Sequence, residues 1–313
     1  MTLFYNHHPT RSKELQILKI LNQRMTFPPK SRTRFYNLQK GYEGEVNFHK
    51  LLKEHLRSDC IVLYDLLLDS NGSEFQLDCI IIQEHNIWHL EIKNFSGDYQ
   101  LTDNKLYSVA SKKEVNNPFI QLERSKFLLG QSLDRLGFNL QLNSYVIFVN
   151  PEFTLYGSKA SFPIIHPTQI IRFIKNLNTS PSILNKSHYN LASKLFHKQV
   201  PEEPYKRLPS YEYEQLNKGV RCPDCNGYLA PHGIHGKSYT CTKCGSREGR
   251  NSVVLRNAVE FNLLFPDRKI TTKAIYDLCG GIISTYKIRK AALQFMQPMG
   301  GKRYKHFIFP FQK

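Results

Sequence analysis

Two short apolar runs within residues 75–95 form the clearest pattern of hydrophobic and polar positions in the chain. Both are rich in β-branched residues, and the polar break at residues 83–86 separates them, which is typical of an antiparallel hairpin. With the turn centred in that break, Asp78 lies opposite Glu91, and Lys93 projects from the same face. A register shifted by one residue is the alternative, and it would make both acids ordinary solvated strand residues.

Two carboxylates directly opposed on neighbouring strands need a compensating cation. Their Cβ atoms would lie about 4.5–5.5 Å apart. At an effective dielectric constant of about 20, two such charges repel by roughly 3–4 kcal/mol. A divalent metal with oxygen ligands would compensate Asp78 and Glu91, and Lys93 would balance the remaining charge. The hairpin therefore predicts a metal site.

Apolar spacing and turn residues predict the elements around this hairpin. We expect the first helix to pack on the domain that follows it, with nucleic-acid contact by this arm as the weaker alternative. The strand before the hairpin and the strand after the third helix would join it in one sheet. The expected helices cover residues 11–25, 41–56, 119–136 and 186–198, the strands residues 60–69 and 144–150, and a further apolar segment residues 170–177.

Two of these helices carry polar residues that bear on the metal site. Glu45 falls on or beside the apolar stripe of helix 41–56, where an acid needs a partner, and the hairpin with its metal would supply one. The alternative is a first-turn glutamate favoured by the helix dipole. Glu43 points away from the stripe. Gln121, near the start of helix 119–136, is expected to point back towards the site.

Four short motifs follow one another in this part of the chain. They are Gly-Tyr-Glu-Gly-Glu on a helix, Gln-Leu-Asp on a strand, Glu-Ile-Lys-Asn on the next strand and Asn-Pro-Phe-Ile-Gln at a helix start. In this order they resemble the nuclease-related domain (NERD) family over roughly residues 38–155. That family is assigned to the PD-(D/E)xK, restriction-endonuclease-like superfamily of nucleases.

The resemblance implies an α/β fold, with a restriction-endonuclease-like mixed sheet flanked by helices, and a phosphodiesterase site that depends on Mg²⁺ or Mn²⁺. It makes Glu45 the helix glutamate, Asp78 the metal aspartate, Glu91 the second carboxylate and Lys93 the lysine of the motif. Leu77 stands where the superfamily name has proline. Fold-level likeness does not by itself establish the chemistry.

Two Cys-x-x-Cys pairs, separated by fifteen residues, predict a metal site of a different kind. The spacing suits a four-thiolate zinc ribbon holding one structural Zn²⁺, with Cys222, Cys225, Cys241 and Cys244 as ligands. Similar ribbons occur in the C-terminal regions of topoisomerases. The remaining cysteines lie in apolar segments and are expected to be buried: Cys60, Cys79 and Cys279.

The segment 268–293 reads as helix, Gly-Gly turn, helix, which resembles a helix-turn-helix. On the second helix, which Ser284 can cap, basic residues alternate with apolar Ile288 and Leu293. A basic hairpin or wing is expected to follow at residues 299–306. The expected nucleic-acid contacts of this region are Lys287, Arg289, Lys290, Lys302 and Arg303. A plain helical hairpin with a solvated basic face is the alternative.

Charge supports a polyanionic partner. The chain holds 43 Lys and Arg against 26 Asp and Glu, a formal net charge of +17, and from residue 202 onward the ratio is 19 to 9. Such an excess favours nucleic acid as partner, with DNA expected. We find neither a run of about 18 apolar residues nor the apolar core of a signal peptide, so we expect a cytoplasmic protein without a membrane partner.

The sequence therefore predicts a metal-dependent nuclease that hydrolyses phosphodiester bonds, with nucleic-acid-binding modules behind it. The alternative is a non-catalytic DNA- or RNA-binding protein that retains the nuclease fold. The expected division is an N-terminal helical arm at 1–37, the nuclease-like domain at 38–155, a helical extension and linker at 156–219, the zinc ribbon at 220–248 and the basic helix-turn-helix-like region at 249–313.

Overall fold

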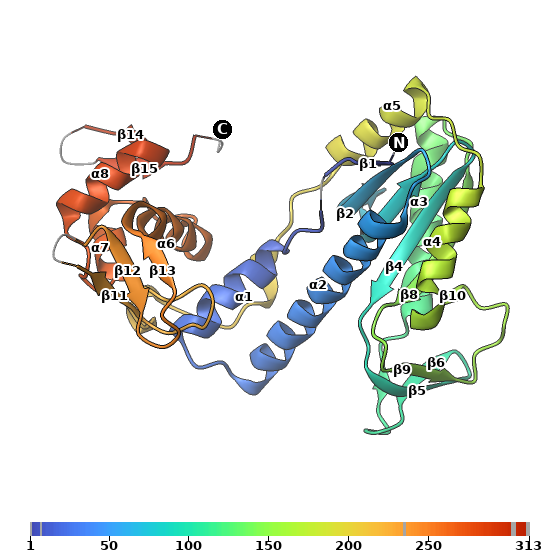
Figure 1. Ribbon diagram of the computed structural model, residues 1–313, viewed down its shortest axis with the longest axis horizontal. Coiled ribbons are helices and arrows are strands. Elements are labelled where there is room, and N and C mark those ends of the chain that lie inside the picture. The colour runs from blue at the N-terminus through green and yellow to red at the C-terminus, as the bar shows by residue number, and fades with distance from the viewer. Residues whose placement is uncertain (1, 7, 234–235, 302–304, 311–313) are drawn as a thin grey trace. The chain divides into compact units, whose positions relative to one another are not determined.

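The computed structural model describes residues 2–6, 8–233, 236–301 and 305–310 and consists of two compact units (Figure 1). The first unit comprises Met1–Arg11 and Tyr36–Glu203, and the second comprises Ser12–Phe35 and Pro204–Lys313. The later boundary falls within the expected linker. Among the described residues, no helix has both the length and the apolar character needed to cross a membrane.

The core of the first unit is a six-stranded mixed sheet, as expected from the sequence. Strands β2, β3 and β4 pair antiparallel, whereas β1 with β2, β4 with β8, and β8 with β10 pair parallel. In spatial order the strands are β1 (Thr2–Phe4), β2 (Cys60–Ser70), β3 (Ser73–Ile82), β4 (Asn86–Lys93), β8 (Gln141–Phe148) and β10 (Ile164–Ile165).

The central hairpin has the predicted register. Ile82 pairs with Ile87, and the ladder continues to Cys79 opposite Leu90. The preceding β2–β3 turn consists of Asn71 and Gly72, with φ values of 55° and 77°. Two-residue hairpin turns of the type that matches the strand twist require positive φ at both positions, and Asn-Gly adopts it at low cost.

Helices cover both faces of this sheet (Figure 1). One cluster of buried side chains joins the sheet to α2 (Pro29–His55) and α4 (Ile170–Thr179), and another joins it to α3 (Pro118–Leu136) and α5 (Lys186–His197). The expected helix 119–136 is confirmed, with Asn117 capping its start. Phe127 lies on the solvent side of α3 and is 65% exposed.

A smaller four-stranded sheet lies beside this core. It includes the polar stretch after Lys93, which was expected to be β-like. Leu101 and Leu106 from this sheet share a buried cluster with Phe119 of α3 and Val146 of β8. In spatial order its strands are β7 (Glu114–Val115), β6 (Lys105–Ser108), β5 (Gly97–Thr102) and β9 (Phe153–Tyr156).

Two expectations about the N-terminal region are wrong. Helix α2 begins at Pro29 rather than at residue 41, so the basic stretch 30–34 is helical; proline is well suited to the first turn because its missing N–H would have no partner there. Helix α1 (Lys13–Arg24) forms as expected but belongs to the second unit, where it contacts α6 (Arg250–Leu264).

Arg24 explains why α1 belongs to the second unit. Its guanidinium group is fully buried, pairs with Glu260 at 2.6 Å, and donates to Asn257 at 3.1 Å and to the backbone oxygens of Asn217 and Gly219. This arrangement depends on partners more than 190 residues away in the sequence, which an amphipathic pattern does not reveal.

Substituting Arg24 with leucine should destabilise the second unit strongly. The change leaves Glu260 with Arg256, at 2.9 Å, in place of two cationic partners, and it leaves Asn257 and two backbone oxygens without this donor. Breaking a buried pair from one side costs about 3–5 kcal/mol when no other cation compensates, which sets the upper bound here. The matched control is Arg34→Leu, because Arg34 pairs with Glu14 at a partly exposed position, where pairs contribute about 1 kcal/mol or less. Urea unfolding followed by circular dichroism measures both, and equal losses for the two variants would contradict the assignment.

The second unit contains a three-stranded sheet and a helical region that share one core. Buried Cys222, Leu229 and Tyr239 cluster with Ile288 and Phe307, so the division expected near residue 248 does not separate two independent cores. Helix α6 was not expected. The elements are β11 (Leu229–His232), β12 (Ser238–Cys241), β13 (Arg247–Gly249), α6, α7 (Thr272–Leu278), α8 (Thr285–Phe295), β14 (Gln297–Met299) and β15 (His306–Ile308), with 3-10 turns at Pro204–Arg207 and Tyr213–Gln215.

Candidate functional site

In β2 and β3, the alternation of side chains between the two faces of the sheet is interrupted at one point. Asp65 of β2 and Asp78 of β3 lie at that point. In β2, the side chains Leu63 and Leu66 belong to the same buried cluster although three positions separate them. In β3 the same holds for Leu77 and Ile80. Asp65 has a φ of 51°, and the ladder skips Asp65 and Asp78 one for one between the Tyr64–Cys79 and Leu66–Leu77 pairs. The irregularity places Asp65 and Asp78 together at the middle of the sheet.

Strand β4 supplies the next three groups. The backbone N–H of Ile92 donates to Asp78 Oδ2 at 2.8 Å. Just beyond the Cys79–Leu90 pair, the Asp78 carboxylate therefore replaces a backbone oxygen as the hydrogen-bond acceptor for β4. Lys93 Nζ forms an ion pair with Glu91 Oε1 and donates to Gln121 Oε1 of α3 at 3.2 Å. Lys93 thus joins Glu91 of β4 to Gln121 of α3.

Helix α2 reaches this site because of a glycine. A Cβ atom added at Gly44 would lie 2.7 Å from Cβ of Asn94, which directly follows β4. Real Cβ atoms do not approach so closely, so only glycine allows α2 to pack against this segment. Asn94 Nδ2 also donates to the backbone oxygen of Lys40 at 2.8 Å. The close approach brings Glu45, the next residue, beside the strand carboxylates, whereas Glu43 is exposed.

A buried histidine ties the strand to α3. His89 Nδ1 lies 3.2 Å from Ser144 Oγ of β8, and its Nε2 lies 3.4 Å from Ser125 Oγ of α3. Burial lowers the pKa of His89 to about 4, so the ring is neutral at physiological pH. Ser125 also donates to the backbone oxygen of Gln121 at 2.9 Å, which fixes the turn that carries Gln121.

Burial and mutual repulsion raise the pKa values of the clustered acids. The pKa of Glu45 rises to about 9, first through burial and then through the charges of Asp78 and Asp65. The pKa of Glu91 rises to about 8 from burial and the charge of Asp78, and burial also raises the pKa of Asp78. Burial alone would lower the pKa of Lys93, but the adjacent carboxylates outweigh it and raise that pKa. One lysine does not balance four acids.

Asp65 was missed by the sequence analysis. Its Oδ2 accepts a hydrogen bond from the backbone N–H of Thr10 at 2.7 Å, and burial raises its pKa to about 6. The signal that could have revealed it is a single charged residue inside the apolar run 60–68, since a lone acid in a buried strand needs a partner.

The acid cluster fits a divalent cation. Carboxylate oxygens are the ligands that Mg²⁺ and Mn²⁺ prefer. Within the described part of the chain, Glu91 Oε2 is buried and has no hydrogen-bond partner, and its carboxyl group shares the site with Asp78. A cation here would bind the free Glu91 oxygen. Its charge would also offset the repulsion among the carboxylates that raises their pKa values.

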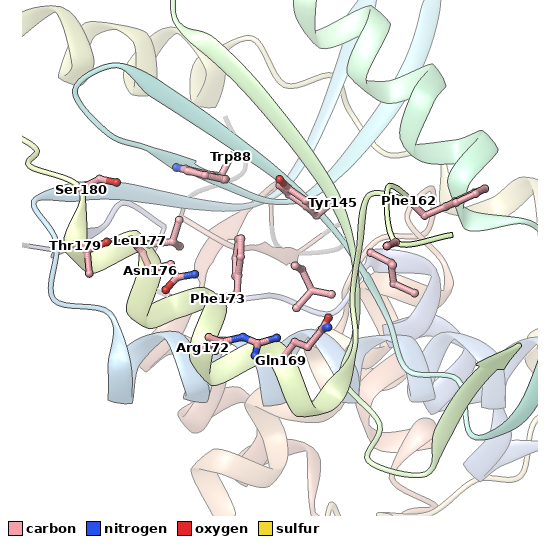
Figure 2. A pocket seen from close by; sticks show the side chains of 13 residues that line it. Trp88, Tyr145, Phe162, Gln169, Arg172, Phe173, Asn176, Leu177, Thr179 and Ser180 are labelled. Atoms are coloured by element: carbon pink, nitrogen blue, oxygen red, sulfur yellow. Dashed lines mark hydrogen bonds between the residues drawn. The ribbon is translucent and has the colours of Figure 1, made fainter. Parts of the chain in front are cut away.

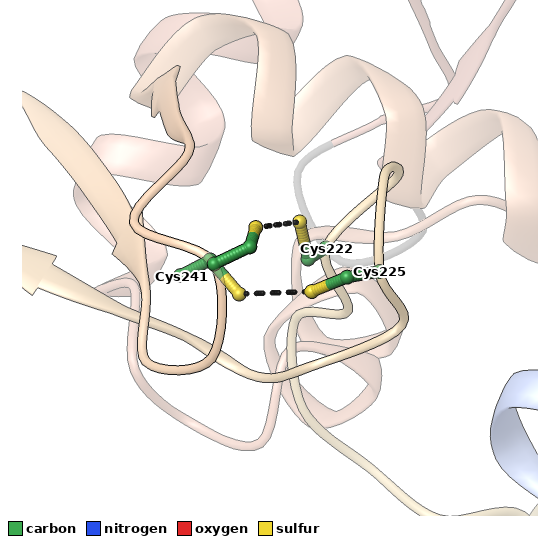
Figure 3. Close-up of side chains that lie close together, drawn as sticks. Cys222, Cys225 and Cys241 are labelled. Atoms are coloured by element: carbon green, nitrogen blue, oxygen red, sulfur yellow. Dashed lines mark hydrogen bonds between the residues drawn. The ribbon is translucent and has the colours of Figure 1, made fainter.

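The four predicted cysteines form a second candidate metal site in the other unit (Figure 3). Their sulfur atoms all lie within 4.8 Å of one another, with Cys222 3.8 Å from Cys244 and Cys225 3.4 Å from Cys241. Among the described residues, no other group of three or more His, Cys, Asp or Glu gathers its ligand atoms this closely. The arrangement can hold a metal ion, and the other three cysteines are buried as expected.

Tight turns allow the thiols to converge. Asn226 and Gly245 follow the two Cys-x-x-Cys pairs with φ values of 60° and 75°. A Cβ atom at Gly227 would lie 2.9 Å from Cys241 Sγ, so any side chain there would displace a sulfur. The ribbon expected from the glycines and cysteines is thus present as β11–β12–β13.

The C-terminal helices form the expected helix-turn-helix. Gly280 and Gly281, both with positive φ, separate α7 from α8. Strands β14 and β15 form the expected hairpin, and Ile270, before α7, bridges to Phe307 of β15. This order of elements, α6, α7, α8 and then the β14–β15 hairpin, is the topology of a winged helix.

The predicted nucleic-acid contacts have different surroundings. Arg289 and Lys290 are exposed on α8, whereas Lys287 is half-buried beside Gly236 of the ribbon. Lys302 and Arg303 lie outside the described residues. Two details are wrong: Leu293 is 46% exposed rather than part of the apolar face, and the side chain of Ser284, although at the N-cap position, makes no capping hydrogen bond.

A mixed sheet with buried acids and a lysine at one point, flanked by helices, defines the first unit as a nuclease-like α/β domain. Residues 40–149 match the family model described as nuclease-related domain (NERD). The match covers the segment in which the sequence motifs indicated this family. Comparisons with curated proteins and with solved structures gave no match.

The raised carboxyl pKa values predict how stability depends on pH. Between the ordinary glutamate pKa of about 4.3 and the folded-state value of about 9 for Glu45, the folded chain binds more protons than the unfolded chain. Stability should therefore fall as pH rises through this window. Glu45→Gln should flatten that fall in EDTA, measured as Tm between pH 5 and 9, whereas exposed Glu43→Gln should leave it unchanged. Identical slopes for both variants would refute the burial of Glu45.

Proposed function

We propose that the chain is a metal-dependent nuclease that cleaves phosphodiester bonds of DNA. The observation that carries the proposal is the convergence of Glu45, Asp78, Glu91 and Lys93 at one buried point of a nuclease-related domain. Such a concentration of perturbed acids costs stability, and groups of this kind cluster at functional sites. A domain that only had to fold would not require it.

Each residue has a distinct role in this proposal. Asp78 and Glu91 would hold Mg²⁺ or Mn²⁺, which polarises the scissile phosphate and lowers the pKa of bound water when present. The backbone N–H of Ile92 fixes the Asp78 carboxylate. Lys93, held by Glu91 and Gln121, donates hydrogen bonds to the attacking water or to the developing charge on phosphate. Glu45 would help to hold the cation from α2.

The second unit would anchor the nucleic acid. We propose that the four cysteines hold one structural Zn²⁺, the metal that tetrahedral thiolate sites favour. The winged-helix topology and the exposed Arg289 and Lys290 on α8 support DNA contact, since a helix in this position reads the major groove in related architectures. A non-catalytic nucleic-acid-binding protein would have the same second unit and would differ only in lacking cleavage.

Substrate class is tested by incubating the purified protein with labelled linear, circular and single-stranded DNA and with RNA, in Mg²⁺, Mn²⁺ or EDTA. We expect metal-dependent cleavage of DNA. Cleavage of circles identifies an endonuclease, and cleavage that requires ends identifies an exonuclease. Binding of all substrates without cleavage in any metal would favour the non-catalytic alternative.

The role of α8 predicts a change in salt dependence. Each phosphate contact contributes about one unit to the slope of log affinity against log salt concentration. Arg289→Ala combined with Lys290→Ala should therefore reduce the slope by about two. Lys273→Ala is the control, because Asp277 pairs with Lys273 at 2.8 Å on α7. Fluorescence anisotropy over a salt series measures the slope, and an unchanged slope in the double variant would exclude α8 as the DNA anchor.

A further inference from the structure

A pocket of about 660 Å³ lies in the first unit, between the sheet and α4 (Figure 2). Its size falls within the range of small-molecule sites. Trp88 of β4 and Tyr145 of β8 line it from the sheet, and Arg172, Phe173 and Asn176 line it from α4. The pocket is not part of the acid site, because Trp88 and Glu91 are an odd number of positions apart on β4 and so point to opposite faces.

The sheet side of the pocket is an ordered aromatic surface. The ring planes of Trp88 and Tyr145 are nearly parallel, with centroids 6.2 Å apart and an interplanar angle of 24°. Phe173 packs against both, 5.8 Å from each, and meets Trp88 edge-on. Trp88 Nε1 donates to Gln83 Oε1 at 2.8 Å, which fixes the indole. Aromatic surfaces of this kind stack nucleobases without preference for sequence.

The α4 side of the pocket is suited to an anion. Arg172 is the one charged residue among those that line the pocket, and it is exposed at the rim. The surrounding segment adds further positive charge: residues 153–201 contain no Asp or Glu, although Glu84 and Asp59 of the sheet side accept hydrogen bonds from the backbone of Ile183 and Leu184. The same segment contains six basic residues, Lys159, Arg172, Lys175, Lys186, Lys194 and Lys198. Arginine binds phosphate through two parallel donors, and the Asn176 amide adds a donor and an acceptor at the same rim.

We propose that this pocket binds a nucleotide, with the base against Trp88 and Tyr145 and the phosphate on Arg172. The ligand can be a free mononucleotide or an unpaired nucleotide of a DNA strand, since base and phosphate are common to both. If the strand is the source, the pocket deepens the proposed nuclease function by holding a single-stranded part of the substrate. The binding itself does not depend on cleavage.

Trp88 reports this binding directly because it is the only tryptophan of the chain. The full-length protein is titrated in EDTA with thymidine monophosphate and, separately, with a short oligothymidylate, while indole fluorescence is excited beyond the nucleotide absorption. We expect saturable quenching. Arg172→Ala should weaken it at least about tenfold. Lys175→Ala, which removes an exposed charge of α4 that does not line the pocket, should change it less than about twofold.

Comparing the two ligands distinguishes a free nucleotide from a nucleotide within a DNA strand as the natural occupant of the pocket. Quenching by the oligonucleotide at far lower concentration than by the monophosphate assigns the pocket to a strand, and similar concentrations assign it to a free nucleotide; both support the proposal. Absence of saturable quenching by either ligand overturns it, as does equal weakening by Arg172→Ala and Lys175→Ala. Asp78→Asn should keep the quenching and lose cleavage, so failure of the pocket and failure of the nuclease site are distinguishable.

Discussion

Replacing Cys222 with serine is expected to abolish metal binding and unfold the second unit. Four-thiolate sites contribute about 10–16 kcal/mol of apparent binding free energy, which matches or exceeds the total stability of a typical domain, about 5–15 kcal/mol. Cys222 is also part of the core that joins the ribbon to α6, α7 and α8. Loss of the metal should therefore spread beyond the ribbon, to the helices and to α1.

Metal analysis should return about one zinc per chain for the wild type and none for Cys222→Ser, and hydrogen exchange should show lost protection in α6–α8. Cys279→Ala is the matched control, because Cys279 lies buried in the same core but is not among the four clustered thiols. Trp88 fluorescence reports on the first unit, which should stay folded. Normal protection of α6–α8 in Cys222→Ser would contradict the shared core.

Asp78→Asn and Lys93→Ala are each expected to remove cleavage while DNA binding stays within a few fold. The asparagine side chain keeps an oxygen for the Ile92 N–H and removes only the charge that would hold the metal. Loss of one electrostatic group at a reacting centre costs about 10²–10³-fold in kcat, and loss of a metal ligand costs more. Binding should survive, because in our proposal the exposed cations of the second unit make most phosphate contacts.

Single-turnover cleavage and anisotropy measured on the same preparations separate the two effects. Lys105→Ala is the control for Lys93→Ala, because Lys105 is exposed on β6 and pairs with exposed Glu114. Wild-type rates in Asp78→Asn or in Lys93→Ala would refute the assigned mechanism. If the variants lose DNA binding to the same extent as cleavage, the two residues contribute to DNA affinity rather than to catalysis.

Structural features that depend on residues close together in the chain could be predicted from the sequence. The register from Ile82–Ile87 to Cys79–Leu90 follows from side-chain alternation and the turn, and the cysteine cluster follows from ligand spacing. The helical stripe predicted that Glu45 needs a partner, and in the structure the charges of Asp78 and Asp65 raise its pKa. The glycine before it, which allows α2 to approach Asn94, stood in the motif, although its packing role became visible only in three dimensions.

Features determined by distant partners were not predictable. Asp65 belongs to the acid cluster through a local irregularity with positive φ, and a run of apolar residues does not specify where a strand will become irregular. Helix α1 joins the second unit through Arg24 and Glu260, which are far apart in the chain. The ribbon and the winged helix share a core, whereas composition suggested two modules. In each case the pattern of apolar and polar residues predicted the helix or strand but not the distant segment against which it packs.

The central claim is metal-dependent cleavage at Glu91 and its neighbours. The most direct measurement compares the wild-type protein with Glu91→Gln, purified in parallel, on DNA substrates that both proteins bind, in Mg²⁺, Mn²⁺ and EDTA. The account predicts product only with the wild type and only in the presence of metal, with equal DNA binding by both proteins. Equal cleavage by the two proteins, or no cleavage by the wild type in either metal despite binding, would contradict it.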